Sequence, residues 1–274
     1  MYKIKPIFII GAPRSGTNML RDALVQFDDV CTWPFDETNF MWKKGYKIYQ
    51  NDELKIENLT EEKIKYIKKE FKKIATINAS NTVVEKTCAN TLRILYIDKI
   101  FPNAKYIFIH RDPIDTIASI KNKWKEGKNY KNFAKQIPWF NFLHLIKFIF
   151  YNIYLKIFAI QNVYSQWGPK IKNIDKIIQE NSLCSIAAIQ WKSCSEVAKQ
   201  DLKELNNNKV FTLKYEDFVN NPKYYLRKIL KFMDVSYENN SIYNSAVHIS
   251  KINIGKGKNF LTSIELAEIN KILS

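Results

Sequence analysis

The segment IFIIGAPRSGTNML, residues 7–20, constrains the fold more than any other part of the chain. Its first four residues are apolar and predict a buried strand, and Gly11 and Gly16 allow the backbone to turn sharply after it. A helix is expected to begin near Thr17. Backbone N–H groups in such a turn converge on one point, and the start of the helix adds a partial positive charge. The segment therefore predicts a strand, an anion-binding loop and a helix in direct succession.

The side chains of this loop indicate a phosphate. The spacing of the two glycines matches the beginning of a nucleoside-triphosphate P-loop, but Thr17 stands where that motif requires a lysine. Arg14 supplies the positive charge instead, and its forked guanidinium suits a bidentate contact with a phosphate. An ATP-dependent phosphotransferase is therefore kept as an alternative that the missing lysine weakens.

A second strand-to-helix junction lies at residues 106–120, YIFIHRDPIDTIASI. Its first five residues predict a strand, and Pro113 suits the first turn of a helix. Arg111 follows the carboxyl end of the strand, and Ser119 falls about two turns into the helix. Both side chains can contact one anion at the edge of a sheet. Taken alone, an arginine before Asp-Pro forms a salt bridge in a loop more often than it binds a ligand.

Together the two motifs resemble the 5′-phosphosulfate loop and the 3′-phosphate motif of sulfotransferases that use 3′-phosphoadenosine 5′-phosphosulfate (PAPS). The resemblance continues, in the family's order, through VVEKTCANTLRILYIDKIFPNAKYIFIHRDP, FTLKYEDFVNNP and, more loosely, HISKINIGKGKNF. The arginine of the first motif resembles the Golgi-type and bacterial branch, which includes tyrosylprotein and carbohydrate sulfotransferases. The resemblance implies transfer of a sulfuryl group from PAPS to an acceptor hydroxyl.

The resemblance also implies which residues act in catalysis. Tyrosylprotein sulfotransferases use a glutamate shortly after the first helix as the base, and Glu37 is the residue here that resembles it, with Asp36 as its competitor. Lys86, at the end of a short apolar strand, resembles the lysine that contacts the bridging oxygen of the donor. Its ammonium would stabilise the leaving phosphate. Arg14 is the third residue expected to act on the reacting groups.

The remaining implied contacts bind the donor. They are Pro13, Arg14, Ser15, Gly16, Thr17 and Asn18 in the first loop, Arg111, Ser119 and Lys123 at the second junction, and Tyr215, Ser250, Lys256 and Lys258 later in the chain. Lys123 lies one helical turn beyond Ser119. The choice between the two late lysines stays open. No metal is expected, because these cations meet the phosphates, and the three histidines and four cysteines show no metal-ligand spacing.

The alternation of patterns predicts one α/β domain over residues 1–274. Further strands are expected near residues 83 and 106 and at 210–213, and helices at 60–74, near 90 and 114, and at 185–205. Such alternation predicts a central parallel sheet with helices on both faces and a ligand at the carboxyl ends of the strands. The cysteines show no clear pairing, although a bond between Cys31 and Cys88 stays open.

Charge and hydropathy bear on partners and location. The N-terminus shows no signal peptide, which predicts a cytoplasmic protein. The net charge of +16 is compatible with three kinds of partner: nucleic acid, an anionic membrane or an acidic substrate. No nucleic-acid-binding signature is visible in the sequence, so nucleic acid is not expected to be a partner. Residues 138–160 predict a core helix or an interfacial helix at the inner face of the membrane. The acceptor expected is a carbohydrate or glycolipid, with a protein tyrosine as the alternative.

Overall fold

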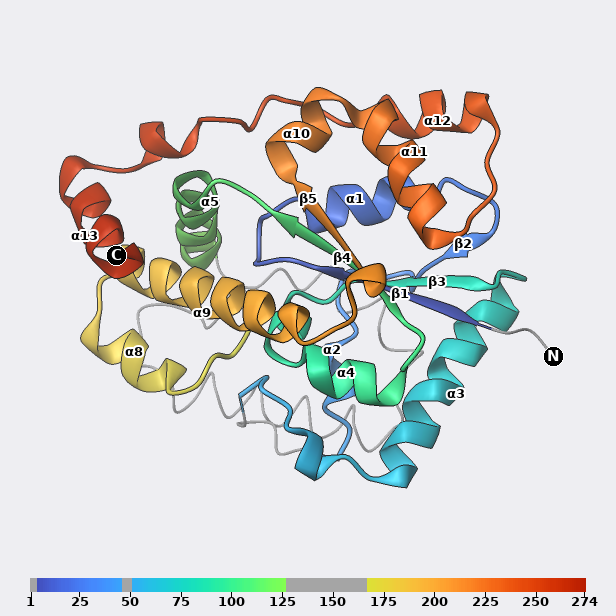
Figure 1. The fold of residues 1–274 in the computed structure, drawn as a ribbon. Coiled ribbons are helices and arrows are strands. Elements are labelled where there is room, and N and C mark those ends of the chain that lie inside the picture. The colour runs from blue at the N-terminus through green and yellow to red at the C-terminus, as the bar shows by residue number, and fades with distance from the viewer. Residues whose placement is uncertain (1–3, 46–50, 127–166) are drawn as a thin grey trace.

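A parallel sheet lies at the centre of the protein (Figure 1). The structure is a computed structural model that describes residues 4–45, 51–126 and 167–274. Within these residues the strands are β1 (Lys5–Ile10), β2 (Val30–Cys31), β3 (Thr82–Glu85), β4 (Lys105–His110) and β5 (Val210–Lys214). Their order is β2-β3-β1-β4-β5, and every neighbouring pair is parallel. The predicted α/β fold is confirmed.

The first strand forms the middle of the sheet, and its side chains are buried on both faces. Ile7 and Ile9 belong to one apolar cluster, whereas Phe8 and Ile10 belong to another. β1 is flanked by β3 on one side and by β4 on the other. The chain therefore leaves β1 at the position where the strand order changes direction, which is where parallel sheets bind their ligands.

Helices cover both faces of this sheet (Figure 1). One face carries α3 (Glu61–Ile77), α4 (Ile94–Ile100) and α9 (Leu183–Lys203). The other face carries α1 (Thr17–Leu24), α10 (Tyr215–Asn220), α11 (Pro222–Met233) and α12 (Asn239–Ala246). A third cluster joins α5 (Pro113–Glu126) to α9 and to α13 (Ser263–Leu273). The remaining described helices are α2 (Asn39–Trp42), α8 (Ile174–Glu180) and 3-10 turns at Ile56–Asn58, Cys88–Leu92, Asn207–Lys209 and Gly257–Phe260.

Aromatic side chains fill the face under α3. The Phe8 ring stacks on the Tyr106 ring, with centroids 5.6 Å apart. The ring centroids of Phe71, in α3, and Phe101 are 4.5 Å apart. α3 begins at an N-cap, where the Thr60 side chain accepts a hydrogen bond from the amide of Lys63. Its buried positions recur at helical spacing, so the helix forms because one face covers the sheet.

Most predicted elements are confirmed. The helix expected near residue 90 is a 3-10 turn followed by the separate helix α4. The two-residue edge strand β2 and the helices α2, α8 and α10 to α13 were not predicted. The predicted helix at 138–160 lies outside the described residues. No helix in the described part of the chain is both long and apolar enough to cross a membrane. All four cysteines carry free thiols, so the disulfide between Cys31 and Cys88, which the sequence left undecided, is absent.

Candidate active site

The loop between β1 and α1 has the geometry expected of an anion-binding turn. Arg14 and Gly16 both adopt positive φ, at 68° and 92°. A Cβ atom on Gly16 would lie 2.5 Å from Cδ2 of Tyr215, and one on Gly11 would lie 2.6 Å from the carbonyl oxygen of Ile109. The loop therefore packs directly against the end of β4 and the start of α10, and both positions require glycine for this close approach.

A carboxylate and an ammonium meet beside this loop. Nζ of Lys86 lies 2.6 Å from Oε1 of Glu37, and the backbone amide of Cys88 donates to the other carboxylate oxygen at 2.9 Å. Lys86 follows β3, and its side chain is only 2% exposed, whereas that of Glu37 is 38% exposed. Sγ of Cys88 lies 4.0 Å from Oγ1 of Thr17 at the start of α1. The ion pair therefore borders the phosphate loop, and Glu37 forms its solvent-facing side.

The charge of Lys86 persists despite its burial. Burial alone lowers the pKa of Lys86, but the nearby Glu37 carboxylate and the hydrogen bond to it outweigh that effect, so the pKa of Lys86 is raised. The side chain therefore carries a full positive charge at neutral pH. Asp36, the competing acid of the sequence analysis, forms a different ion pair, with its Oδ1 3.0 Å from Nη1 of Arg21.

A buried carboxyl group holds the two loops on which this pair lies. Glu85 is fully buried at the end of β3 and accepts hydrogen bonds from Thr38, Thr87 and Asn90. Thr38 follows Glu37 and Thr87 follows Lys86, and the amide of Thr38 also donates to Oγ1 of Thr87 at 2.9 Å. Burial raises the pKa of Glu85. The sequence analysis missed this cluster, although an acid ending an apolar strand was a visible signal.

A cavity of about 220 Å³ lies where the two predicted phosphate motifs meet. Nε of Arg14 donates to Oγ of Ser119 at 3.0 Å, which joins the first loop to α5. The lining residues are Arg14, Arg111, Asp115, Ala118, Ser119, Asn122, Asn253, Lys256, Gly257 and Phe260. The structure thus brings four of the predicted donor-binding residues together around one space, although they are far apart in the chain.

Arg111 is held in place on several sides. Its Nη1 donates to the carbonyl oxygen of Arg14 at 3.2 Å, and its Nη2 contacts Asp115 at 3.4 Å and the carbonyl oxygen of Asn253. The guanidinium also lies 4.6 Å from the ring centroid of Tyr215, which is buried. Nε of Arg111 is buried and has no hydrogen-bond acceptor among the described residues. A buried donor without an acceptor at the border of a cationic cavity fits an anionic ligand.

Three predicted donor contacts lie apart from this cavity. The ammonium of Lys123 pairs with Glu126, one turn further along α5. Ser250 is exposed, and its Oγ accepts a hydrogen bond from the amide of Ile252 at 3.2 Å. Lys258 lines a neighbouring hollow of about 580 Å³. Of the two late lysines, Lys256 is therefore the one that lines the cavity with Arg14.

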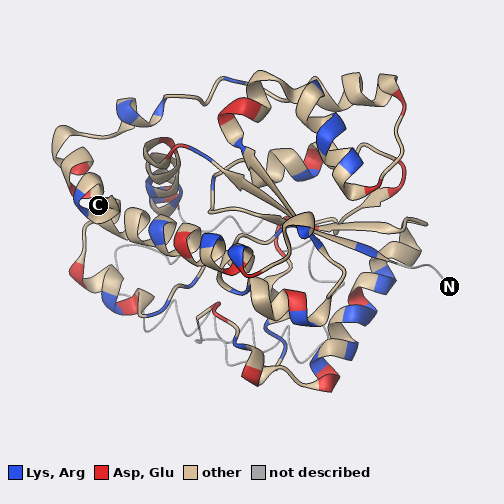
Figure 2. Ribbon diagram, in the orientation of Figure 1, with Lys and Arg blue, Asp and Glu red and all other residues tan. Residues whose placement is uncertain are grey.

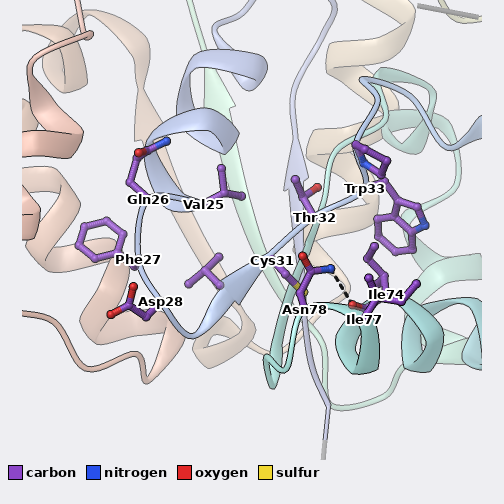
Figure 3. Close-up of a pocket in the computed structure, with 12 residues that line it drawn as sticks. Val25, Gln26, Phe27, Asp28, Cys31, Thr32, Trp33, Ile74, Ile77 and Asn78 are labelled. Atoms are coloured by element: carbon purple, nitrogen blue, oxygen red, sulfur yellow. Dashed lines mark hydrogen bonds between the residues drawn. The ribbon is translucent and has the colours of Figure 1, made fainter. Parts of the chain in front are cut away.

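Another hollow, of about 480 Å³, lies at the edge strand β2 (Figure 3). Its lining comes from residues 25–34 and from the end of α3, where the amide side chain of Asn78 donates to the carbonyl oxygen of Ile74 at 2.8 Å. None of the predicted site residues lines it. In residues 4–45, 51–126 and 167–274, no three histidine, cysteine or acidic side chains gather as metal ligands.

Comparison with known proteins agrees with this arrangement. The profile of the sulfotransferase family matches residues 6–141. A search of curated protein sequences returns no match. Similar solved structures include the sulfotransferase domain from the curacin biosynthetic pathway, with a TM-score of 0.59 and 15% identity over 99% of this chain and 97% of that one.

Two bacterial enzymes are similar in the same way. Sulfotransferase STF9 from Mycobacterium avium has a TM-score of 0.57 and 13% identity over 100% of this chain and 76% of its own. A sulfotransferase from Alicyclobacillus acidocaldarius has a TM-score of 0.51 and 14% identity over 98% of this chain and 95% of its own. At these identities the structures show a shared fold, and the family match adds the motifs. Residues 6–141, which contain both phosphate motifs, match the family of sulfotransferases, and the chain as a whole shares the fold of these enzymes.

Proposed function

We propose that this protein transfers a sulfuryl group from PAPS to an acceptor hydroxyl, with Glu37 as the base and Lys86 as the cation at the leaving phosphate. The observation that carries the proposal is the 2.6 Å contact between these two side chains beside the phosphate loop. PAPS supplies the sulfuryl group. Transfer requires a group that takes the proton of the acceptor and a cation where charge accumulates, and the pair provides both.

The burial of Lys86 and the exposure of Glu37 suit these roles. A buried ammonium attracts the charge developing on a leaving oxygen more strongly than an exposed one, because little water screens it. Glu37 is the partner that solvent, and hence an acceptor hydroxyl, can contact. This use of a glutamate follows the Golgi-type and bacterial branch that the sequence resembles. Asp36 is the less suitable base because it pairs with Arg21 rather than with the lysine proposed to act at the leaving phosphate.

The ammonium of Lys86 and the carboxylate of Glu37 neutralise each other. Glu37 uses one oxygen for Lys86 and the other for the amide of Cys88. A donor phosphate bound near Lys86 competes for the ammonium and frees one carboxylate oxygen of Glu37. The freed oxygen can then accept the proton of the acceptor hydroxyl.

The donor's phosphates have two separate sites in this proposal. The 5′-phosphosulfate lies in the first loop, which leads into the N-terminus of α1. Its proposed contacts are Pro13, Arg14, Ser15, Gly16, Thr17 and Asn18. The 3′-phosphate lies in the 220 Å³ cavity near Arg111, Ser119 and Lys256, and Tyr215 supports Arg111. Lys123, Ser250 and Lys258 are proposed contacts only if the donor draws them inward.

The acceptor proposed is a hydroxyl of a carbohydrate or glycolipid, and a protein tyrosine is the alternative. A glycolipid acceptor would bring the protein to an anionic membrane at its cytoplasmic face. The basic outer surface of α3 supports that contact (Figure 2), because Lys65, Lys68, Lys69 and Lys72 are exposed at helical spacing. Sedimentation with vesicles of phosphatidylserine and phosphatidylcholine, or of phosphatidylcholine alone, tests the contact between α3 and an anionic membrane.

Residues 1–274 are proposed to act as one domain.

Calorimetric titration tests the proposed donor. We expect adenosine 3′,5′-bisphosphate, the product left after transfer, to bind without metal and more tightly than ATP with magnesium. Preference for magnesium and ATP would support the phosphotransferase alternative and overturn the proposal. Transfer of labelled sulfate from PAPS to a panel of glycans, glycolipids and tyrosyl peptides then identifies the acceptor class.

A further inference from the structure

A buried aspartate fixes the glycine-lysine segment near the end of the chain. Asp115 lies in the first turn of α5, and its side chain is 3% exposed. Its Oδ1 accepts a hydrogen bond from the amide of Gly257 at 2.6 Å, and its Oδ2 accepts one from the amide of Gly255 at 2.7 Å. Both carboxylate oxygens therefore hold backbone groups of the segment on either side of Lys256.

The same carboxylate orients Arg111. Nη2 of Arg111 contacts Oδ2 of Asp115 at 3.4 Å and also donates to the carbonyl oxygen of Asn253, which belongs to the same late segment. Asp115, Arg111 and residues 253–257 thus form one connected unit. Movement of the aspartate would disturb the guanidinium and the late segment together.

Close packing supports the same contact independently of the hydrogen bonds. A Cβ atom on Gly257 would lie 2.6 Å from Cα of Asp115 and 2.7 Å from its amide nitrogen. These are backbone atoms in a helix, so they have little freedom to move away. Gly255, in contrast, has open space within 4 Å of its added Cβ. Position 257 therefore needs glycine for its contact with α5.

The charges around the cavity match one phosphate monoester. Arg14, Arg111 and Lys256 line it together with a single carboxylate, that of Asp115. Three cations and one anion leave two positive charges, and a phosphate monoester carries a charge of about −1.5 to −2 at neutral pH. The carboxylate does not face the cavity as a free anion, because amides and a guanidinium engage both of its oxygens.

We propose that Asp115 is a positioning residue that latches the segment 253–257 onto α5 and thereby makes the cavity selective for nucleotides with a 3′-phosphate. The inference rests on the proposed function, since it assumes that the cavity receives the 3′-phosphate of the donor. Without the latch, Lys256 and Arg111 lose their common orientation, and the 3′-phosphate loses its contacts. The 5′-phosphate site shares Arg14 with this cavity and keeps its other residues in the first loop.

Two nucleotides separate this role from a general effect on folding. Adenosine 3′,5′-bisphosphate and adenosine 5′-monophosphate differ only in the 3′-phosphate, and calorimetry gives the ratio of their affinities. In Asp115→Asn, one acceptor oxygen becomes a donor facing an amide or a guanidinium. We expect the affinity for the bisphosphate to fall about tenfold to hundredfold, as for lost hydrogen bonds to charged groups. The affinity for the monophosphate should change less than threefold.

Two further variants complete the experiment. Gly257→Ala leaves the carboxylate intact and displaces the segment, so it should reduce the affinity ratio in the same direction even if Asp115→Asn folds poorly. Asp175→Asn removes an exposed acid from the first turn of α8, away from the cavity, and should leave the ratio unchanged.

The outcomes distinguish the latch from the proposed function. A wild-type protein that prefers the bisphosphate, with an unchanged ratio in Asp115→Asn and Gly257→Ala, overturns the latch alone. An equal loss of both nucleotides in the two variants also overturns it, because the aspartate would then be only structural. A wild-type protein that binds neither nucleotide overturns the proposed function and the latch with it.

Discussion

Replacement of Gly16 by alanine tests the packing of the phosphate loop on α10. Gly16 has φ of 92°, and an added Cβ would lie 2.5 Å from Cδ2 and 2.9 Å from Cε2 of Tyr215. A residue other than glycine in the left-handed region costs about 1–2 kcal/mol, and overpacking adds about 1–3 kcal/mol. We therefore expect Gly16→Ala to lower the free energy of unfolding by about 2–5 kcal/mol.

Gly45→Ala is the matched control for this experiment. Gly45 has φ of 83°, but the nearest atom to its added Cβ is Cε of Lys63 at 3.7 Å, so only the backbone cost applies. Urea unfolding of both variants, with an unchanged m-value, gives the two free-energy differences. A destabilisation of Gly16→Ala within about 0.5 kcal/mol of Gly45→Ala, the usual error of such comparisons, would refute the predicted clash with Tyr215.

Three other changes have expected results. Glu37→Gln should retain binding of adenosine 3′,5′-bisphosphate within about twofold and reduce sulfate transfer about 100-fold or more, since it removes the base; retained transfer would favour Asp36. Lys86→Met removes the buried ammonium, whose raised pKa keeps it charged at neutral pH, and should also reduce transfer about 100-fold. The hydrogen bond from Lys121 lowers the pKa of Glu265, so this pair stabilises the protein above the ordinary glutamate pKa and loses its effect as pH falls through the lowered value. Glu265→Gln should therefore destabilise the protein by about 1–3 kcal/mol at pH 7, as for a lost hydrogen bond to a charged group, and by progressively less as the pH is lowered in a series of urea unfolding measurements.

The sequence predicts elements well where a local pattern defines them. β1 and β4 are continuous apolar runs, and α3 repeats its buried residues at helical spacing. β2 has only two residues, too few for any periodicity, and it pairs only with β3. The residues near position 90 form a 3-10 turn, and the side chain of Asn90 donates to the buried Glu85. The burial of Glu85 depends on tertiary packing, so no local pattern contains it.

The candidate site also combines residues that a local motif predicts with contacts that depend on the folded chain. Arg14, Glu37 and Lys86 lie beside strand or helix ends, and motif resemblance predicts a role for each of them. The contact between Asp115 and the amides of Gly255 and Gly257 joins residues from distant parts of the chain. Its only local signal was the four-residue spacing of Arg111 and Asp115. Only the folded chain reveals that this acid faces the late glycines.

The walls of the 220 Å³ cavity come from segments that are far apart in the sequence: Arg14 and residues 111–122 form one wall, and residues 253–260 form the second. A nascent chain on the ribosome that has been synthesised as far as α11 contains all five described strands but not the second wall. The 3′-phosphate site is therefore completed only after the sheet has been synthesised. In the folded protein, a bound phosphate would bridge the two walls and oppose local unfolding of the segment that carries Lys256.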